Sequence, residues 1–301
     1  MLRAERAPRR AALALGLVVA APLLGRGCLG GELRMATYNL RHFGAEAKDM
    51  GRLAGILETI DVDILAVQEV REPGQLEQLA GDLSGLRRAY RAVSSECAGR
   101  RGMHVGFLYD TRKVTLKKTR EFRELLPEEG GCSGGDRPGL LGVFEAGGKE
   151  VHALVVHLKA GGKDEEFRQR KEQIGRLRRL VAVLKAEGAG RIVLLGDLNT
   201  TGFLENERGE RDLIEEAARQ EGLAVATGGL RCTEYYRKDR RRMEPSLLDH
   251  VLVSGDALVP SSVEVHAHCA ELRCTPQQPD TMPPSYMDVS DHCPVTFRLA
   301  P

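Results

Sequence analysis

The sequence has no tryptophan, and aromatic side chains make up only 4% of its 301 residues. Surfaces that stack unpaired nucleic-acid bases are built from such side chains, so the sequence gives no sign of an extended stacking platform. There is also no excess of charge of one sign, with 44 basic and 43 acidic residues. A protein that attracts polyanions through its overall field needs a basic excess. Any attraction to nucleic acid must therefore come from a local group of basic residues.

Several common catalytic and metal-binding motifs are missing too. We find neither a glycine-rich phosphate-binding loop nor a serine or cysteine nucleophile elbow, so the motifs of nucleotide-binding enzymes and of covalent hydrolases do not compete. There is no C-x-x-C pair, which argues against zinc as the reason for the seven cysteines. We also find no internal repeat, no low-complexity segment and no boundary between domains.

Residues 1–30 have the pattern of an export signal. Four arginines precede the apolar stretch 11–24, which is too short for a comfortable membrane span. We predict a signal peptide over 1–30, one domain over 31–301, and a secreted or periplasmic protein. An uncleaved membrane anchor, a twin-arginine export route and a lipid on Cys28 are the alternatives. Without the five arginines and one glutamate of residues 1–30, the chain carries 39 basic and 42 acidic residues, a net charge of −3.

Six cysteines follow the predicted signal: Cys97, Cys132, Cys232, Cys269, Cys274 and Cys293. An even number in an exported chain predicts disulfide bonds, and six cysteines allow fifteen pairings. We expect Cys232 to pair with Cys269 or Cys274, because all three lie in loops that flank the later polar motifs.

Hydrophobic periodicity predicts strands and helices in alternation. Strands are expected at 32–39, 63–69, 103–109, 114–117, 140–144, 151–157, 191–197, 247–253 and 290–299, and helices at 48–60, 75–86, 164–187 and 212–220. A hairpin turn is expected at 110–113, and loops are expected at 127–139, at 231–242, which is basic, and at 266–290. Because Pro294 cannot donate a backbone hydrogen bond, it indicates that the last strand lies at a sheet edge. The basic run of helix 164–187, which includes Arg170, is most simply a solvated helix face.

The run Arg191-Ile-Val-Leu-Leu-Gly-Asp-Leu-Asn-Thr200 is the centre of the functional argument. Its uninterrupted apolar part predicts a strand buried on both faces. Asp197 and Asn199 follow it two positions apart and therefore project to the same side of an extended chain. A strand exit through Gly-Asp and Asn explains the same residues, so the other strand ends must decide.

Those strand ends carry polar side chains as well: Asn39, Glu69, His157, Asp249, and Asp291 with His292. Acids, amides and two histidines are the groups needed for metal-assisted hydrolysis of a phosphate ester. Oxygen ligands such as Glu69 and Asn39 suit Mg²⁺ or Ca²⁺ rather than Zn²⁺. One imidazole can take a proton from the attacking water while the other protonates the leaving oxygen.

Six short motifs, taken in order, resemble those of the endonuclease/exonuclease/phosphatase family. They are Thr37-Tyr-Asn-Leu-Arg-His-Phe-Gly44, Val67-Gln-Glu-Val-Arg71, Val156-His-Leu-Lys159, Gly196-Asp-Leu-Asn199, Leu248-Asp-His250 and Ser290-Asp-His-Cys-Pro-Val295. The resemblance covers residues 33–299, and the first two motifs are most similar to the secreted pancreatic-type deoxyribonuclease branch. It implies an α/β fold, a four-layer α/β sandwich with two central mixed β-sheets packed face to face and helices outside.

The resemblance also implies roles for the polar residues. Glu69 would be the main Mg²⁺ ligand, with Asn39 nearby and Asp291 contributing, and Mn²⁺ or Ca²⁺ could replace Mg²⁺. His292, oriented by Asp249, would activate water. His157 would act as general acid or bind a phosphoryl oxygen.

The remaining implied roles concern the substrate. Asp197 and Asn199 would position the phosphate and the nucleophile. Arg41 and Arg137 fall where deoxyribonuclease-like members direct arginines toward substrate phosphates, although both could equally be surface charges.

The sequence departs from the deoxyribonuclease branch at two places. That branch has an acidic residue, paired with the acid histidine, where this chain has Met103-His104, so the partner of His157 is open. The tyrosine that enters the minor groove has no clear counterpart near 99–102.

These observations predict a secreted Mg²⁺-dependent phosphodiesterase that hydrolyses nucleic acid as a monomer. The alternative keeps the chemistry and changes the substrate to a phospholipid, as in a sphingomyelinase or a phosphoinositide phosphatase. Its membrane contact would be the loop 276–287, which contains Met282, Tyr286 and Met287. A scaffold without catalytic activity is the third interpretation, and the six motifs argue against it.

Overall fold

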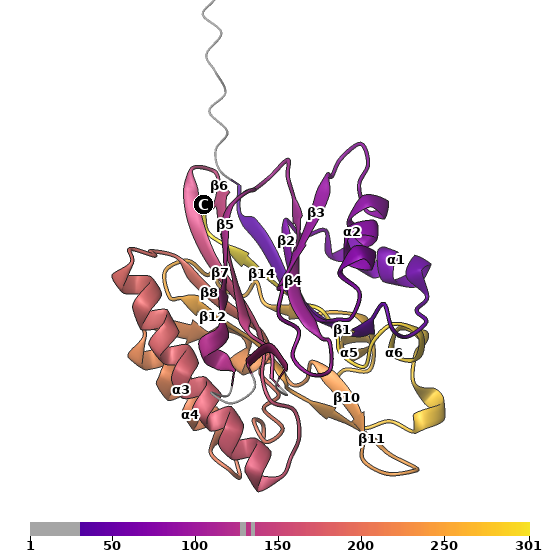
Figure 1. Ribbon diagram of the computed structural model, residues 1–301. Coiled ribbons are helices and arrows are strands. Elements are labelled where there is room, and N and C mark those ends of the chain that lie inside the picture. Colours follow the sequence, from indigo (N-terminus) through magenta and orange to yellow (C-terminus); the bar gives the residue numbers. More distant parts are fainter. Residues whose placement is uncertain (1–30, 127–130, 134–135) are drawn as a thin grey trace, which may run out of the picture.

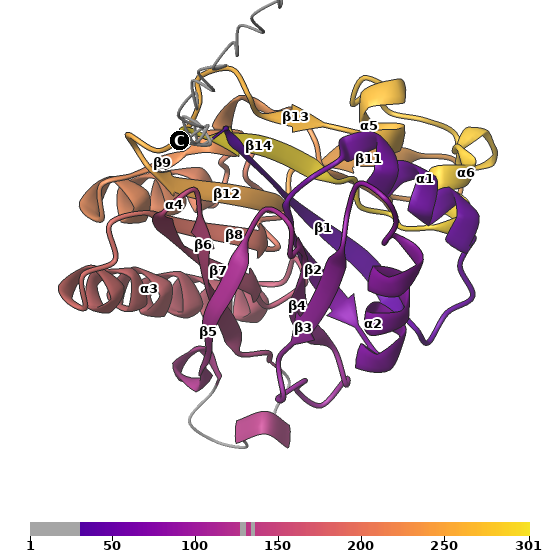
Figure 2. The same cartoon turned by 90° about the horizontal axis from the view of Figure 1, so that it is seen from above.

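The computed structural model describes residues 31–126, 131–133 and 136–301. The predicted signal peptide, Cys28 and part of the expected loop 127–139 lie outside the described residues. Two six-stranded sheets pack face to face, with helices on their outer sides (Figures 1 and 2). Within the described part of the chain, no helix is long and apolar enough to cross a membrane.

The first sheet has the strand order β13-β14-β1-β2-β4-β3. Its strands are β1 (Leu33–Phe43), β2 (Ile64–Val70), β3 (Tyr90–Ser94), β4 (His104–Asp110), β13 (Glu264–Val265) and β14 (Val295–Leu299). The pair β1/β2 is parallel, and the other pairs are antiparallel. Helix α1 (Met50–Ile60) makes the crossover between the two parallel strands.

The second sheet has the order β5-β6-β7-β8-β12-β9 and repeats this plan. Its strands are β5 (Thr115–Phe122), β6 (Gly139–Ala146), β7 (Lys149–His157), β8 (Ile192–Asp197), β9 (Leu223–Val225) and β12 (Asp249–Ser254). Only β7/β8 is parallel, and helix α3 (Asp164–Ala186) makes its crossover.

The layers follow from the alternation of side chains along each strand. In β8, Val193 and Leu195 point into the core between the sheets, while Leu194 joins the outer core beneath α3 and α4 (Glu210–Gln220). On the other side, α1 and α2 (Pro73–Asp82) cover the first sheet. The predicted four-layer sandwich is confirmed, and so is the burial of the 191–197 strand on both faces.

Two expected loops contain regular structure. The 231–242 segment starts a hairpin of β10 (Glu234–Arg237) and β11 (Met243–Ser246), and 266–290 contains short helices α5 (Ala267–Glu271) and α6 (Pro284–Asp288). These segments share a small core around the buried Tyr235 and two disulfides, which no hydrophobic periodicity could reveal. The disulfides are Cys97–Cys132, Cys232–Cys274 and Cys269–Cys293, so the predicted Cys232–Cys274 alternative is confirmed.

Three other expectations were wrong. The last strand is not an edge strand, because β13 pairs with the outer side of β14. The turn at 110–113 does not close a hairpin, since β4 belongs to the first sheet and β5 to the second. Arg170 is not on a solvated helix face: it is fully buried and its guanidinium pairs with Glu210 (Nη2 to Oε1, 2.7 Å), which satisfies its charge inside the protein.

Candidate active site

The predicted site residues meet because the carboxyl ends of both parallel strand pairs lie at the same edge of the sandwich. In the first sheet, Asn39 of β1 lies opposite Gln68, which precedes Glu69. In the second sheet, His157 of β7 lies opposite Asp197 of β8. The antiparallel strand β12 begins at this edge, which places Asp249 opposite Asp197. By the same logic, the segment before β14 returns to the end of β1 and delivers His292.

The carboxylate of Asp197 lies at the centre of the cluster. Its Oδ2 accepts a hydrogen bond from Asn39 Nδ2 at 2.9 Å and lies 3.3 Å from His157 Nε2 and 3.8 Å from His292 Nε2. Its Oδ1 accepts from the backbone N–H of Asn199 at 2.8 Å. Burial raises the pKa of Asp197, with the charge on His292 acting in the opposite direction. Four polar groups, three of them from distant segments, thus converge on one carboxylate.

Gly196 allows this strand end to form. Its φ is +137°, and a Cβ at this position would lie 2.1 Å from the carbonyl oxygen of Val156 on β7. A side chain would push β8 away from β7 and separate His157 from Asp197.

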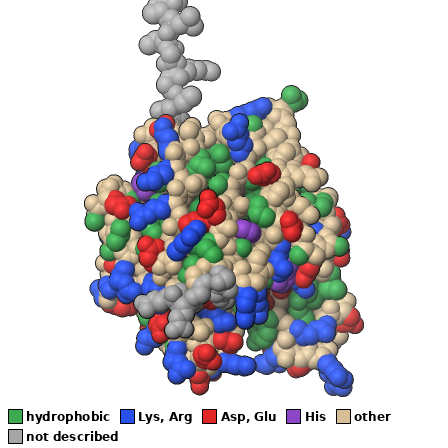
Figure 3. All heavy atoms as spheres, viewed as in Figure 1, with side chains coloured by type: hydrophobic (Ala, Val, Ile, Leu, Met, Phe, Trp, Pro, Cys, Tyr) green, Lys and Arg blue, Asp and Glu red, His purple; other side chains and the backbone are tan. Residues whose placement is uncertain are grey.

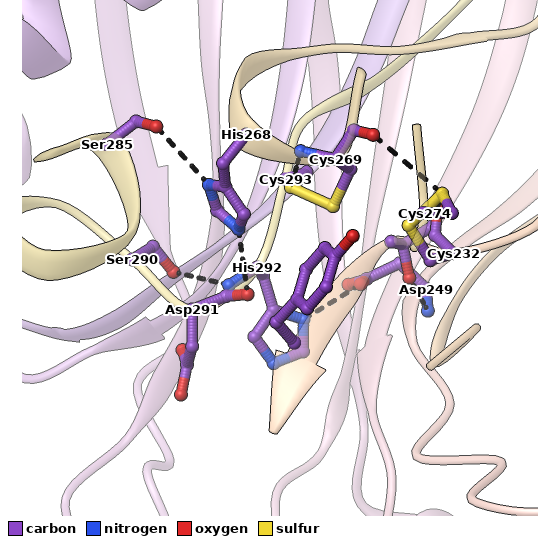
Figure 4. The surroundings of a disulfide bond; sticks show 12 residues. Cys232, Asp249, His268, Cys269, Cys274, Ser285, Ser290, Asp291, His292 and Cys293 are labelled. Carbon is purple, nitrogen blue, oxygen red and sulfur yellow. Dashed lines mark hydrogen bonds and ion pairs between the residues drawn. A yellow bond between two sulfur atoms is a disulfide. The ribbon is translucent and has the colours of Figure 1, made fainter. Parts of the chain in front are cut away.

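His292 is held from two sides. Its Nδ1 lies 2.8 Å from Asp249 Oδ2, and its backbone N–H donates to Ser290 Oγ at 3.1 Å. The adjoining Cys293 is bonded to Cys269, and His268 Nε2 lies 3.2 Å from the carbonyl oxygen of Asp291 (Figure 4). Burial alone would lower the pKa of His292, but contact with Asp249 and the charge of Asp197 raise it well above its usual value. His292 is therefore the histidine with the high proton affinity.

The pKa of His157 is shifted in the opposite direction. Its Nε2 faces the carboxylates, 3.3 Å from Asp197 and 3.8 Å from Glu69 Oε1, whereas its Nδ1 is buried with no hydrogen-bond partner among the described residues. Burial and, next, the charge of Arg137 lower the pKa of His157 well below its usual value. His104, which stands where the deoxyribonuclease branch has its acid, instead uses Nδ1 to contact the carbonyl oxygen of Ser95 at 2.6 Å. In the part of the chain that the structure describes, no acidic side chain bonds to Nδ1 of His157.

Glu69 and Asn39 form the side of the cluster that belongs to the first sheet. Glu69 has a φ of +60°, unusual for a residue with a side chain, and its Oε2 accepts from the backbone N–H of His42 at 3.0 Å. Asn39 Oδ1 accepts from the backbone N–H of Arg41 at 2.9 Å, so its NH₂ group faces Glu69 and Asp197. Asn39 thus bridges the two carboxylates.

The donor set fits a hard divalent cation. Glu69 presents a partly exposed carboxylate, and Asp197, Asp249 and His292 offer ligand atoms within 4.8 Å of one another. A second group, His268 with Cys269 and Cys293, does not fit zinc, because its two sulfurs form a disulfide.

The predicted substrate residues lie at two depths. Arg137 is buried, donates from Nη2 to the carbonyl oxygen of Leu158 at 3.1 Å, and has no hydrogen-bond partner for Nε among the described residues. Asn199 Nδ2 donates to the same carbonyl at 3.2 Å. Arg41 lies at the surface, with Nε 3.5 Å from Glu46 and 3.9 Å from Asp291. Arg137 is therefore part of the cluster and not a surface charge.

Sequence reasoning missed three residues at the site. His42 Nδ1 lies 3.6 Å from Glu69 Oε2, and its place within the first motif could have indicated it. The charge of the exposed Arg101 reaches both His157 and Arg137 and contributes to lowering their pKa values. Glu234 is buried beside His292, a position that depends on the β10–β11 hairpin and leaves no signal in the sequence.

Comparison with known proteins gives one family. The sequence model of the Endonuclease/Exonuclease/phosphatase family matches residues 36–292. No curated protein sequence gives a significant match.

Solved structures with a similar fold come from bacteria and animals. One is a protein of that family from Bacteroides thetaiotaomicron, with 20% identity, a TM-score of 0.60, and coverage of 89% of this chain and 95% of that chain. The mannosyl-6-phosphatase Bt3783 of Bacteroides thetaiotaomicron VPI-5482 has 20% identity and a TM-score of 0.59 over 89% of this chain and 99% of that chain. TDP2 from Caenorhabditis elegans has 17% identity and a TM-score of 0.61 over 90% and 75%. At these identities the likeness shows the fold.

Proposed function

Because the chain belongs to the endonuclease/exonuclease/phosphatase family, whose members hydrolyse phosphoester bonds and generally use divalent metal ions, we propose that it is a metal-dependent phosphodiesterase of nucleic acid. The observation that carries the proposal is the convergence of His157 and His292 on Asp197, beside the partly exposed carboxylate of Glu69. This arrangement places two imidazoles and two carboxylates on the same side of the sandwich.

Glu69 would hold the cation, with Asp291 as a further oxygen donor. Asn39 would join them through its amide oxygen after a rotation of the amide, because that oxygen accepts from the backbone N–H of Arg41 in the structure. Mg²⁺ is the expected ion, and Mn²⁺ or Ca²⁺ are the alternatives, because all of these donors are hard oxygens. When bound, the cation supplies charge neutralisation for the phosphoryl oxygens.

The neutral form of His292 would accept the proton of the attacking water, and the hydrogen bond to Asp249 would hold the imidazole in position. The water oxygen then bonds to phosphorus, the bond from phosphorus to the leaving oxygen breaks, and the leaving oxygen takes up a proton from solvent water. Of the two roles expected for His157, the low pKa favours a neutral imidazole whose Nε2–H donates to a phosphoryl oxygen. Arg137 would bring its free Nε–H to the same oxygens, and Asp197 with Asn199 would position the phosphate.

A local basic surface supports a nucleic-acid substrate. The β10–β11 hairpin carries Arg237, Lys238, Arg240, Arg241 and Arg242. Basic side chains project at the lower right of Figure 3, where Figure 1 places this hairpin. Contacts from arginine and lysine to phosphates give affinity without base specificity. The missing partner of His157 and the absence of a tyrosine at 99–102 do not support the minor-groove binding of the pancreatic branch.

The phospholipid alternative has less support. In the loop 276–287, Met282 is buried and Tyr286 packs against the disulfide-rich core, which leaves Met287 as the exposed large apolar side chain. A single methionine is a small anchor for a membrane surface.

Plasmid nicking tests the proposal. Purified protein of residues 31–301 with its disulfides formed is expected to convert supercoiled plasmid to open circles with Mg²⁺ and to stop when EDTA is added. Absence of cleavage of plasmid, single-stranded DNA and RNA over a range of salt and divalent metals would overturn it. Export, which the three disulfides support, is checked by finding the processed chain outside the cytoplasm.

A further inference from the structure

Glu234, the first residue of β10, is buried and has one carboxyl oxygen that is unpaired among the described residues. The residue is 5% exposed, and its Oε2 has no hydrogen-bond partner among the described residues. Leaving such a group unpaired in the interior costs stability, so a folded chain that retains one invites a functional explanation. No step of the proposed hydrolysis uses this group.

The backbone places Glu234 directly beside His292. The two residues form a β-bridge flanked by hydrogen bonds from Tyr235 N–H to the Asp291 carbonyl (3.1 Å) and from Cys293 N–H to the Thr233 carbonyl (2.8 Å). Glu234 and His292 are therefore a non-hydrogen-bonded pair of the antiparallel type. In such a pair the two side chains project to the same side of the sheet. The Glu234 carboxyl therefore lies next to the reacting centre.

A cavity of about 620 Å³ adjoins this position. Glu234 and Tyr236 of β10 line it together with the loop 201–208, which follows Asn199, and with 245–248, which precede Asp249. Its walls are thus extensions of the segments that carry the candidate catalytic residues. The volume accommodates a ring the size of a sugar or a nucleobase.

The charges of the lining residues indicate what the cavity can accept. Its two cations already have partners: Arg208 lies 3.3 Å from Asp164, and Lys238 lies 3.7 Å from Glu244. The lining groups without an ion-pair partner among the described residues are three carboxyls, Glu205, Glu207 and the buried Glu234. A carboxyl oxygen needs an O–H or N–H donor. Tyr236, which is 45% exposed, adds an aromatic face against which a ring can stack.

We propose that this cavity is a specificity subsite in which Glu234 accepts a hydrogen bond from a hydroxyl or amine of the sugar or base ring next to the scissile phosphate. The inference rests on the proposed function and adds a substrate class to it. Substrates with a donor-bearing neutral ring beside the phosphate are preferred to those without one.

The test compares two substitutions on matched substrates. Glu234→Gln keeps the shape and one acceptor oxygen, whereas Glu234→Leu removes both oxygens. Each is assayed with Mg²⁺ on bis(p-nitrophenyl) phosphate, which has no donor, and on oligoadenylate, oligodeoxyadenylate and oligothymidylate. Ribose against deoxyribose isolates the 2′-hydroxyl, and deoxyadenylate against thymidylate compares the exocyclic amine of adenine with the ring N–H of thymine. Glu216→Gln, an exposed carboxyl on α4, is the charge-matched control.

In Glu234→Leu, kcat/KM for the preferred oligonucleotide relative to bis(p-nitrophenyl) phosphate is expected to fall about ten- to a hundred-fold, mainly through KM. The melting temperature is expected to rise, because an unpaired buried carboxyl is gone. Glu216→Gln should leave the kcat/KM ratio and the melting temperature unchanged.

If neither substitution of Glu234 changes the kcat/KM ratios among the four substrates, the subsite is overturned. An equal loss on all four substrates also overturns it, because Glu234 would then act on His292 and not on the ring. If the unsubstituted protein hydrolyses none of the four, the proposed function fails and the subsite falls with it. Hydrolysis with unchanged ratios contradicts the subsite alone.

Discussion

The candidate site has a buried floor and an exposed rim, which differ in solvent exposure and in backbone conformation. The floor consists of Asp197, Asp249, His157 and His292, none of which is more than 7% exposed. The rim consists of Arg41, His42, Glu69 and Asp291, whose side chains are 16–36% exposed. Three rim residues also have positive φ values: Arg41, His42 and Glu69.

The difference indicates a division of work between the two regions. Charges interact strongly in the floor because water is excluded, so proton affinities there can be moved far apart, as they are for His157 and His292. Under the proposed function, the rim would exchange a cation and a nucleic-acid substrate with solvent. Its backbone is strained at three residues. Substitutions in the floor should therefore change the chemical step, and substitutions in the rim should change binding.

The largest effect is expected in the floor. His292→Ala and His157→Ala should each lower kcat by roughly 10²–10⁴, because proton transfer and phosphoryl hydrogen bonding act in the transition state. The measurement is kcat on bis(p-nitrophenyl) phosphate at saturating Mg²⁺. His152→Ala, at the far end of the same strand as His157, is the matched control and should keep the normal rate. Full activity of both floor variants would disprove the assigned roles.

At the rim, Glu69→Gln should act mainly on the cation. The Mg²⁺ concentration for half-maximal activity should rise at least about ten-fold, because a charged oxygen ligand is replaced by a neutral one. Mg²⁺ should raise the melting temperature of the normal protein but not of this variant. Glu58→Gln on α1 is the control. An unchanged metal requirement would remove Glu69 from the ligand set.

How far the sequence predicts the site depends on the same division. Asp197 and His157 could be identified because each ends an uninterrupted apolar strand, and strand ends are visible in the sequence. Glu234 could not, because its burial depends on a hairpin and two disulfides that unite segments with no periodicity. Arg170 was misplaced for a related reason: a buried arginine and a solvated one look alike until the partner, Glu210, is known.

Farther from the centre, the hairpin should affect binding of nucleic acid only. Arg240→Gln with Arg241→Gln removes two charges, so the slope of log affinity against log salt should become less negative by up to about 2. Oligonucleotide binding at several salt concentrations measures this. Arg219→Gln on α4 should leave the slope unchanged. Identical slopes in the hairpin variant would exclude phosphate contacts there.

The last prediction concerns stability beneath the floor and not activity. His250 is buried between Thr200 (Oγ1 to Nε2, 2.7 Å) and Thr227 (Oγ1 to Nδ1, 3.2 Å), and burial lowers its pKa to about 4. The unfolded chain, with a histidine pKa of about 6.5, binds the proton more readily. The contribution of His250 is therefore fully present above about pH 6.5 and is lost as the pH falls toward 4, with a total of order 3 kcal/mol.

His250→Gln should therefore lose less melting temperature than the normal protein between pH 7 and pH 4, as measured by calorimetry. Parallel curves for the two proteins would show that His250 does not titrate in this way.

A double-mutant cycle on hydrolysis of bis(p-nitrophenyl) phosphate by Glu69→Gln, His157→Ala and the combined variant tests most directly whether floor and rim form one reaction centre. Residues that act on the same transition state are strongly non-additive, so the combined variant is expected to be about as slow as the slower single variant. Losses in kcat/KM that simply multiply would contradict a common centre, because they would show that the two residues act independently.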